Sequence, residues 1–376
     1  MEIASSREAG LAMTDRYNSE GQIINEMNWF RDNISSLEPY QPGFQPKEGG
    51  FVKLNTNENP YPPAPGAGRA LRDFSAGRLR LYPDPLSTGL REMIGEVYGF
   101  PLERIIVGNG SDELLSIALR CFAGEGDRVA FPTPSYSLFQ VLARIQGAKA
   151  RAYELDEDFG LPEDFTSAPA SLKLIATPNS PTGTVFPIPA IERILRKSEG
   201  VVLVDEAYVD FSEENCLPLL LDFPNLVVTR TLSKSYSLAG ARVGYAFASE
   251  EIVAGMMKVK DSYNLNSVSA AAATAALADQ DYFGEIAARI VAERERLAQS
   301  LVELGFKVFP SGANFLLCRP PEGRAREMYE DLFERKILVR WFDTPRLCEY
   351  LRISIGTPEE MDLLTGAIQE ILPQRD

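Results

Sequence analysis

Short apolar runs alternate with amphipathic segments through the middle of the chain, from residue 76 to residue 284. The run Val201–Val204 is entirely apolar, which is the pattern of a strand buried on both faces of a sheet. Further strands are predicted at 104–107, 128–131, 149–155, 172–176, 226–229 and 243–248. Helical periodicity separates several of them, at 89–98, 114–122 and 188–197. This alternation predicts an α/β fold, in which a mainly parallel sheet carries helices on both faces.

The C-terminal part of the chain predicts a smaller α+β unit. Apolar residues recur at helical spacing from Phe283 to Leu304, and Gly305 is expected to end that helix. Further strands are predicted at 307–309, 314–318, 337–340 and 350–355, and helices at 325–335 and 358–371. The short strand Val52–Leu54 has no partner nearby in sequence, so we expect it to pair with this unit.

These patterns predict two domains and an N-terminal arm. Residues 76–284 form the large domain, and residues 28–75 and 285–376 together form the small domain. Residues 1–27 are polar and lack sustained periodicity. They are expected to form a flexible arm, or one that is ordered only against a partner.

The composition limits which binding partners and which cellular compartment are expected for this protein. The net charge of −15 argues against nucleic acid and anionic membranes as partners. The four cysteines are far apart, which argues against a disulfide framework and a thiolate metal site. The sequence shows neither a signal-peptide pattern nor an apolar run of about 18 residues. A soluble cytoplasmic protein without a metal is therefore expected.

The chain contains no histidine. This excludes Ser-His-Asp and Cys-His nucleophile arrangements, HExxH zinc sites and imidazole proton shuttles. Acid–base chemistry must then fall to other side chains or to a cofactor.

A glycine-containing loop, Gly108–Glu113, follows a predicted strand and opens a helix. It lacks the third glycine of the dinucleotide-binding fingerprint and does not match a P-loop. Two interpretations stay open. Ser111 or Asp112 caps the helix, or the backbone N–H groups at the helix start bind a phosphate.

Lys234 lies between Ser233 and Ser235, and Arg242 follows eight positions later. This is either a surface lysine in a polar loop or a lysine that holds an aldehyde cofactor as a Schiff base while the arginine binds its phosphate. Asp205 closes a predicted buried strand. A carboxylate there requires an ion pair, a helix to cap, or a protonated pyridine nitrogen as its partner.

Taken together, the polar motifs resemble the fold-type I pyridoxal-phosphate aminotransferases, and within them the histidinol-phosphate aminotransferase branch. The motifs run in family order from about residue 30 to the end of the chain. They are Asn55-Thr-Asn-Glu-Asn-Pro-Tyr61, Tyr82-Pro-Asp84, Gly108-Asn-Gly-Ser-Asp-Glu113, Pro178-Asn-Ser-Pro-Thr-Gly183, Val204-Asp-Glu-Ala-Tyr-Val-Asp-Phe211, Thr231-Leu-Ser-Lys-Ser235, Arg242-Val-Gly244, Asp261-Ser-Tyr-Asn264 and Leu351-Arg-Ile-Ser-Ile-Gly-Thr357.

The resemblance implies pyridoxal 5′-phosphate as the cofactor and assigns residues around its ring. Lys234 would carry the Schiff base and afterwards move the proton. Asp205 would keep the pyridine nitrogen protonated, and Tyr208 completes the catalytic set. Asn179 and Tyr208 would hydrogen-bond the ring hydroxyl, and Tyr136 would stack on the ring face.

The same resemblance assigns the phosphate, the subunit contact and the substrate. Backbone groups of Ser111 and Asp112, with Ser233 and Arg242, would bind the cofactor phosphate. Tyr82 would reach the phosphate in a partner subunit, which implies a homodimer. The residues implied for substrate binding are Tyr40, Asn57, Arg340 and Arg352. Arg352 would grip the carboxylate of glutamate or 2-oxoglutarate by a bidentate contact, and with Arg340 and Tyr40 it would also bind the phosphate of the amine substrate.

The implied reaction moves an amino group from L-histidinol phosphate to 2-oxoglutarate. The nearest alternative keeps the cofactor and changes the amine, as in aromatic amino-acid aminotransferases, threonine-phosphate decarboxylases and enzymes of specialised amino-acid biosynthesis. An alternative of another class is a catalytically silent regulatory or binding protein on the same fold.

Overall fold

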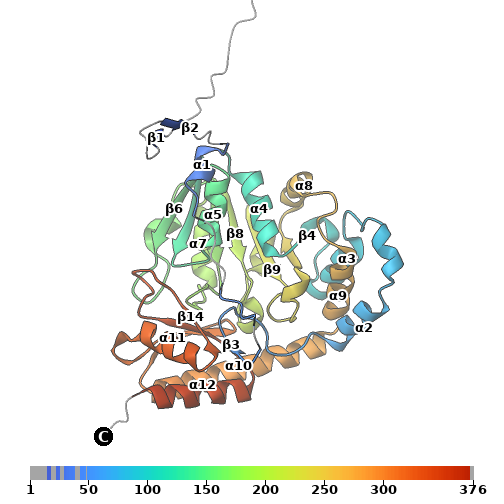
Figure 1. The fold of residues 1–376 in the computed structure, drawn as a ribbon. Coiled ribbons are helices and arrows are strands. Elements are labelled where there is room, and N and C mark those ends of the chain that lie inside the picture. The colour runs from blue at the N-terminus through green and yellow to red at the C-terminus, as the bar shows by residue number, and fades with distance from the viewer. Residues whose placement is uncertain (1–14, 18–22, 26–28, 39–42, 48, 373–376) are drawn as a thin grey trace, which may run out of the picture.

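The computed structural model describes residues 15–17, 23–25, 29–38, 43–47 and 49–372. A seven-stranded sheet forms the centre of the larger unit, in the order β4-β10-β9-β8-β7-β5-β6 (Figure 1). Its strands are β4 (Ile105–Gly108), β5 (Arg128–Thr133), β6 (Lys149–Glu154), β7 (Leu172–Ala176), β8 (Val201–Asp205), β9 (Leu226–Thr231) and β10 (Gly244–Phe247). All neighbouring strands are parallel except β10, which is antiparallel to both β4 and β9. The predicted α/β architecture is confirmed.

Helices cover both faces of this sheet, and alternate residues of each central strand explain why. In β8, Val202 and Val204 pack into one apolar cluster, whereas Leu203 packs into another on the opposite face. The first cluster includes residues of α3 (Thr88–Tyr98), α6 (Glu163–Thr166), α7 (Ile188–Lys197) and α9 (Ser267–Leu277). The second includes residues of α4 (Ser111–Phe122), α5 (Leu138–Ile145) and α8 (Glu250–Val259). Burial on both faces accounts for the apolar runs in the sequence.

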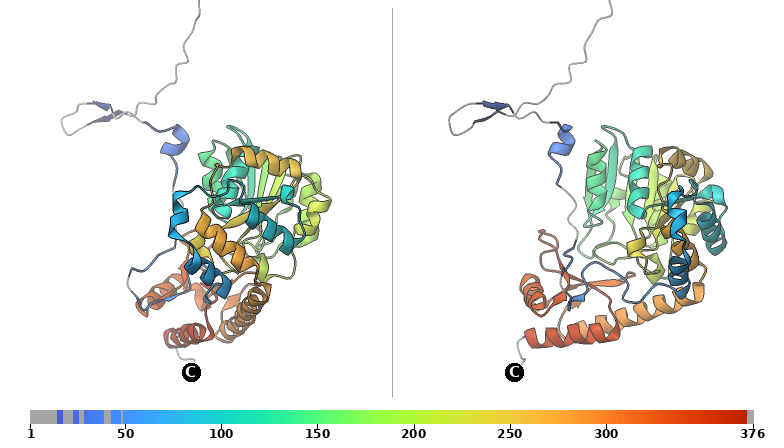
Figure 2. Two further views of the ribbon diagram at one scale, coloured as in Figure 1. Left: turned by 90° about the vertical axis from the view of Figure 1, so that its right-hand side faces the viewer. Right: turned by 45° about the vertical axis from the view of Figure 1, so that its right-hand side comes forward.

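The smaller unit is built on a four-stranded antiparallel sheet in the order β11-β12-β15-β14. Its strands are β11 (Lys307–Val308), β12 (Phe315–Arg319), β14 (Arg340–Trp341) and β15 (Leu351–Ser354). Its helices are α10 (Gln280–Glu303), α11 (Ala325–Glu334) and α12 (Pro358–Ile371). Helix α10 runs below both units, with α12 beyond its end (Figure 2). As predicted, Gly305 follows this helix in a left-handed conformation, with φ at 88°.

The N-terminal strand β3 (Val52–Lys53) belongs with the smaller unit. It pairs in parallel with β13 (Ile337–Leu338), which confirms the expectation for this strand. The predicted single strand at 337–340 is wrong, because the chain breaks at Val339 into β13 and β14. The first piece pairs with β3 and the second with β15.

One helix and two short strands in the N-terminal part of the chain were not predicted from the sequence. Helix α2 (Pro65–Asp73) packs against α9, and strands β1 (Asp15–Tyr17) and β2 (Ile23–Asn25) pair antiparallel with each other. The short helix α1 (Asp32–Ser35) lies against the end of α5, where the Asn33 side chain donates to the Arg144 carbonyl at 2.8 Å. The domain boundaries remain a prediction. Within the part of the chain described above, none of the helices combines the length and apolar character needed to cross a membrane.

A buried ion pair fixes the ends of the two central strands. Arg230 of β9 pairs with Glu206, directly after β8, with 2.8 Å between Nη2 and Oε2. Their side chains are 6% and 0% exposed, so each charge depends on the other for compensation. The Arg230 guanidinium also lies 5.0 Å from the centroid of the Tyr98 ring.

We expect Arg230→Met to lower the free energy of unfolding by about 3–5 kcal/mol, because it leaves Glu206 buried without a counter-charge. Urea unfolding monitored by circular dichroism measures this change. Arg289→Met is the matched control, since Arg289 pairs with Glu285 on the exposed face of α10. That change is expected to cost less than about 1 kcal/mol. Equal losses in the two variants would contradict the role given to the buried pair.

Candidate active site

Polar residues converge where the parallel strands end, and the reversed strand β10 joins them there. Strands β4, β5, β7, β8 and β9 point the same way, so their carboxyl ends share one edge of the sheet. Strand β10 starts at this edge because Gly244 is the register partner of both Gly108 and Thr231. Arg242, two residues before β10, is therefore brought to the same edge.

Groups that could hold an anion lie together at the start of α4, and we call them the cradle. Gly110 is the N-cap residue of this helix, with φ at 82° and without a side-chain cap. The Arg242 guanidinium passes so close that a Cβ on Gly110 would lie 2.7 Å from its Nη2. Arg242 Nη1 also lies 3.3 Å from Ser233 Oγ. A helix N-terminus, an arginine and a serine hydroxyl together form a donor set that suits a phosphate.

Asp112 links the cradle to Tyr136. The Tyr136 hydroxyl donates to Asp112 Oδ1 at 2.9 Å, and Arg242 Nη2 lies 3.2 Å from Asp112 Oδ2. The alternative in which Ser111 or Asp112 caps α4 is therefore wrong, because the N-cap position belongs to Gly110. The stacking of Tyr136 on a cofactor ring remains a prediction.

Asp205 is a buried carboxyl at the end of β8, only 4% exposed. It accepts a hydrogen bond from the Thr229 hydroxyl at 3.0 Å. Burial, with a smaller contribution from the charge of Asp112, raises the pKa of Asp205 to about 7. A cation beside Asp205 would favour its charged form, so the site fits a protonated ring nitrogen.

Lys234 and Tyr208 lie together beside this edge. The Lys234 ammonium donates to the Thr56 carbonyl at 3.4 Å and lies 5.5 Å from the centroid of the Tyr208 ring. The Tyr208 hydroxyl accepts a hydrogen bond from Asn57 Nδ2 at 2.9 Å. Burial opposes ionisation of Tyr208, but the charges of Lys234 and Arg352 and the bond from Asn57 outweigh it and lower the pKa of the phenol.

Ser354 of the smaller unit holds Asn57 in place. The sequence patterns did not identify Ser354 as a site residue. The Asn57 N–H donates to Ser354 Oγ at 2.8 Å, and the Ser354 hydroxyl donates to Asn57 Oδ1 at 3.0 Å. Asn57 has a left-handed backbone, with φ at 55°. Ser354 lies two residues after Arg352 on β15, and this same-face spacing was the available signal.

Asn179 is fully buried in the loop after β7, and its side chain is engaged by protein. Its Nδ2 donates to the Pro134 carbonyl at 3.0 Å and to Thr182 Oγ1 at 2.9 Å. Its Oδ1 accepts from the Ser135 hydroxyl at 2.6 Å. These bonds tie two strand-end loops together. A hydrogen bond from Asn179 to a ring hydroxyl remains a prediction, and it would replace one of the bonds that Asn179 Nδ2 now makes to Pro134 and Thr182.

The two predicted substrate arginines lie opposite each other in the smaller sheet. Arg340 of β14 is the register partner of Arg352 of β15. Arg352 donates to Ser180 Oγ at 3.2 Å and to the Asn55 carbonyl at 2.9 Å. Since Ser180 follows Asn179 after β7, these bonds bring the arginine pair toward the strand-end residues. Tyr40 lies outside the described residues. Gly43, which is close to Tyr40 in sequence, lies beside Arg340, because a Cβ added to Gly43 would be 3.7 Å from Arg340 Nη1.

Tyr82 is on the surface rather than in the cradle of its own chain. Its side chain is 81% exposed, and its ring stacks on Tyr263 with 4.5 Å between centroids.

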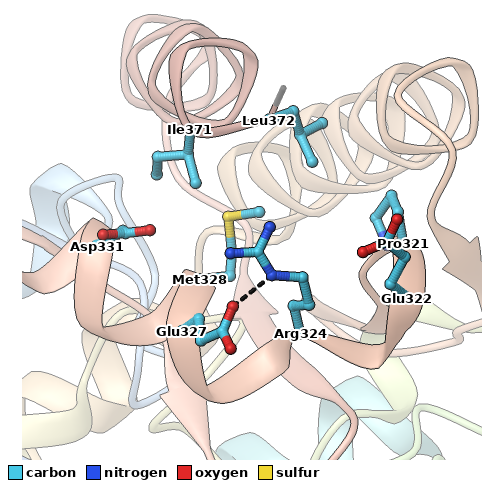
Figure 3. A pocket seen from close by; sticks show the side chains of 8 residues that line it. All are labelled: Pro321, Glu322, Arg324, Glu327, Met328, Asp331, Ile371 and Leu372. Carbon is cyan, nitrogen blue, oxygen red and sulfur yellow. Dashed lines mark hydrogen bonds and ion pairs between the residues drawn. The ribbon is translucent and has the colours of Figure 1, made fainter. Parts of the chain in front are cut away.

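A separate hollow lies between α11 and α12 of the smaller unit (Figure 3). Met328 and Ile371 provide apolar walls, and Arg324 pairs with Glu327 at its mouth. Its lining includes none of the predicted site residues. It carries no arrangement that suggests a reaction. Among the described residues there is also no group of three or more acidic or cysteine side chains that could hold a metal.

We expect the pKa of Tyr208 to be lower than that of an ordinary tyrosine and Asn57→Ala to shift this ionisation to higher pH. The substitution removes a hydrogen bond that stabilises the phenolate. The ultraviolet difference spectrum between each protein and its Tyr208→Phe counterpart isolates this titration. Asn59→Ala is the control, because Asn59 instead donates to the Lys234 carbonyl at 3.0 Å. An unchanged titration in Asn57→Ala would contradict the assignment.

Comparison with known proteins identifies the family of this chain. The family described as aminotransferase class I and II matches residues 50–368. A histidinol-phosphate aminotransferase from Microcystis aeruginosa is 46% identical over 342 residues, covering 91% of this chain and 98% of that protein. Histidinol-phosphate aminotransferase 1 from Nostoc sp. is 43% identical over 351 residues, covering 93% and 99%. The crystal structure of histidinol-phosphate aminotransferase from Sinorhizobium meliloti in complex with pyridoxal-5′-phosphate has a TM-score of 0.84 to this chain, at 27% identity and with 92% and 99% coverage. The chain belongs to the class I and II aminotransferases.

Proposed function

We propose that this protein is a pyridoxal-phosphate-dependent transaminase that moves an amino group from L-histidinol phosphate to 2-oxoglutarate. The observation that carries the choice of amine is the pairing of Arg340 with Arg352 on neighbouring strands, next to the cofactor site. Two guanidinium groups can hold a phosphate ester by charge-assisted hydrogen bonds. The names of the relatives at 43–46% identity support the same substrate. The reaction is assigned to the cytoplasm as part of this proposal.

The residues at the sheet edge divide the work on the cofactor. Pyridoxal phosphate, when bound, supplies the electron sink that stabilises negative charge at the reacting carbon. Asp205 would hold a proton on the ring nitrogen, and Arg242, Ser233 and the start of α4 would hold the phosphate. The site lacks histidine, so the Lys234 amine is the group that takes and returns the substrate proton.

Tyr208 and Asn57 would orient the ring of the cofactor. The lowered pKa of Tyr208 makes its oxygen a good hydrogen-bond partner for an acidic ring hydroxyl. Ser354, on the same strand as Arg352, hydrogen-bonds Asn57, and Asn57 in turn donates to the Tyr208 hydroxyl. Substrate binding at Arg352 and the orientation of Tyr208 therefore depend on one strand.

A homodimer is part of the proposal because several apolar side chains close to Tyr82 in sequence are exposed. Leu79, Leu81, Tyr82 and Leu86 are between 50% and 81% exposed, and the ring of Tyr263, 47% exposed, stacks on Tyr82. Exposed apolar side chains of this kind favour a protein interface. The family resemblance implies that Tyr82 would reach the cofactor phosphate of a partner subunit, and its exposure leaves the side chain available for that contact.

The reaction is tested with a panel of amines and 2-oxoglutarate, with glutamate formation as the measurement. L-Histidinol phosphate is expected to be turned over fastest, ahead of L-histidinol, O-phospho-L-threonine and the aromatic amino acids. Lys234→Ala is expected to lose turnover by a factor of at least about 10⁴ and to lose the visible absorbance of the wild type. Preference for another amine would reject the proposed substrate, and turnover by Lys234→Ala would reject the proposed mechanism.

Arg340→Gln tests recognition of the phosphate. We expect the ratio of kcat/KM for L-histidinol phosphate to that for L-histidinol to fall about 10- to 100-fold, since a charge-assisted contact is lost. Arg346→Gln is the control, because the Arg346 side chain donates to the Asp156 carbonyl and lies 5.1 Å from the Phe159 ring centroid. An unchanged ratio in Arg340→Gln would place phosphate recognition elsewhere.

A further inference from the structure

The pairing of Arg340 with Arg352 poses an electrostatic problem. Side chains directly opposite each other on antiparallel strands have Cβ atoms about 4.5–5.5 Å apart, and like charges in this arrangement destabilise the sheet. Arginine stays charged at all physiological pH values, so the repulsion cannot be relieved by loss of a proton. The pair is also half-buried, which limits screening by water.

Phe342 contacts both charges. It follows β14 directly, and its ring centroid lies 5.3 Å from Cζ of Arg340 and 5.6 Å from Cζ of Arg352. The ring is half-buried and packs against the large apolar cluster of the central sheet, so its position is fixed by the core. The negative face of an aromatic ring attracts a guanidinium at such distances.

An aromatic ring and a carboxylate placed beside the two arginines would contact different parts of the guanidinium groups. A carboxylate between the two arginines would compensate their charge but would occupy the in-plane N–H groups that recognise anions. Contact with a ring face offsets part of the repulsion and does not itself take up an N–H group, although Arg352 also donates to Ser180 and to the Asn55 carbonyl. Arg352 also lies 5.3 Å from the Phe315 ring centroid, whereas Phe342 contacts both members of the pair.

We propose that Phe342 is a positioning residue that holds Arg340 and Arg352 together in the geometry that binds a dianionic phosphate. The inference rests on the proposed function for the identity of the phosphate ester. The property that it concerns is the affinity of the arginine pair for a dianion, whichever substrate carries that dianion. Phe342 acts through the arginines and takes no part in proton transfer.

The test compares Phe342→Leu, which removes the ring, with Phe342→Tyr, which keeps it. Holoenzyme is used throughout, so that the cofactor phosphate already fills the cradle at α4. For Phe342→Leu we expect the KM for L-histidinol phosphate and the Kd for inorganic phosphate, measured by calorimetry, to rise about three- to thirtyfold. We expect kcat to change less than about threefold and the visible spectrum of the bound cofactor to stay unchanged. Phe342→Tyr is expected to stay within about twofold of the wild type in both constants.

Phe333→Leu is the matched control, because Phe333 is an aromatic residue of α11 that packs on Phe44 and Phe51. It is expected to leave phosphate affinity unchanged. If Phe342→Leu does not fold, Phe342→Met keeps a similar volume without a ring and carries the same expectation. Unchanged phosphate affinity in the ringless variant, or equal losses in Phe342→Tyr or Phe333→Leu, would overturn the inference. Failure of the wild type to use L-histidinol phosphate would instead reject the proposed function, and the calorimetric result for inorganic phosphate would still decide the role of Phe342.

Discussion

The buried carboxyl of Asp205 is the constraint on which the rest of the site depends. It lies at the end of a strand covered on both faces, and the Thr229 hydroxyl supports it. Burial nevertheless raises its pKa to about 7. The buried arginine of the adjacent strand, Arg230, pairs with Glu206 and not with Asp205. A carboxyl so placed gains from a cationic ligand, and a protonated pyridine ring meets that need.

Strand direction explains why the other groups come to the edge of the sheet where Asp205 lies. The parallel strands deliver Asn179, Tyr208 and Lys234 from the loops that follow them, and the reversed β10 delivers Arg242 from the loop that precedes it. Gly244 allows this approach, because a Cβ there would lie 2.4 Å from the Ser111 nitrogen at the start of α4. The small unit adds Arg352 through its bonds to Ser180 and Asn55. In the proposed function, cofactor chemistry therefore belongs to the large sheet, and choice of substrate belongs to the strands of the small one.

Much of this arrangement could be predicted from the sequence, for physical reasons. The apolar run Val201–Val204 predicts a strand that is buried on both faces, and Gly305 predicts the end of a long helix. The order of the polar motifs resembles the family that the comparisons confirm. Other features leave no comparable pattern. The direction of β10 depends on its neighbours, not on its own apolar residues. The break at Val339 arises because β13 and β14 pair with different strands. Ser354 is an ordinary strand hydroxyl until the fold places it against Asn57, and Phe342 is an ordinary aromatic until two arginines flank it.

The central claim is that the carboxylate of Asp205 and the protonated nitrogen of the cofactor ring form an ion pair. The most direct measurement is the ¹⁵N chemical shift of the ring nitrogen in holoenzyme prepared with labelled pyridoxal phosphate. At pH 8 we expect the shift of a protonated nitrogen in the wild type and that of an unprotonated nitrogen in Asp205→Asn, because asparagine carries no charge to stabilise the cation. An unprotonated ring nitrogen in the wild type, or the same protonated state in both proteins, would contradict this account of the site.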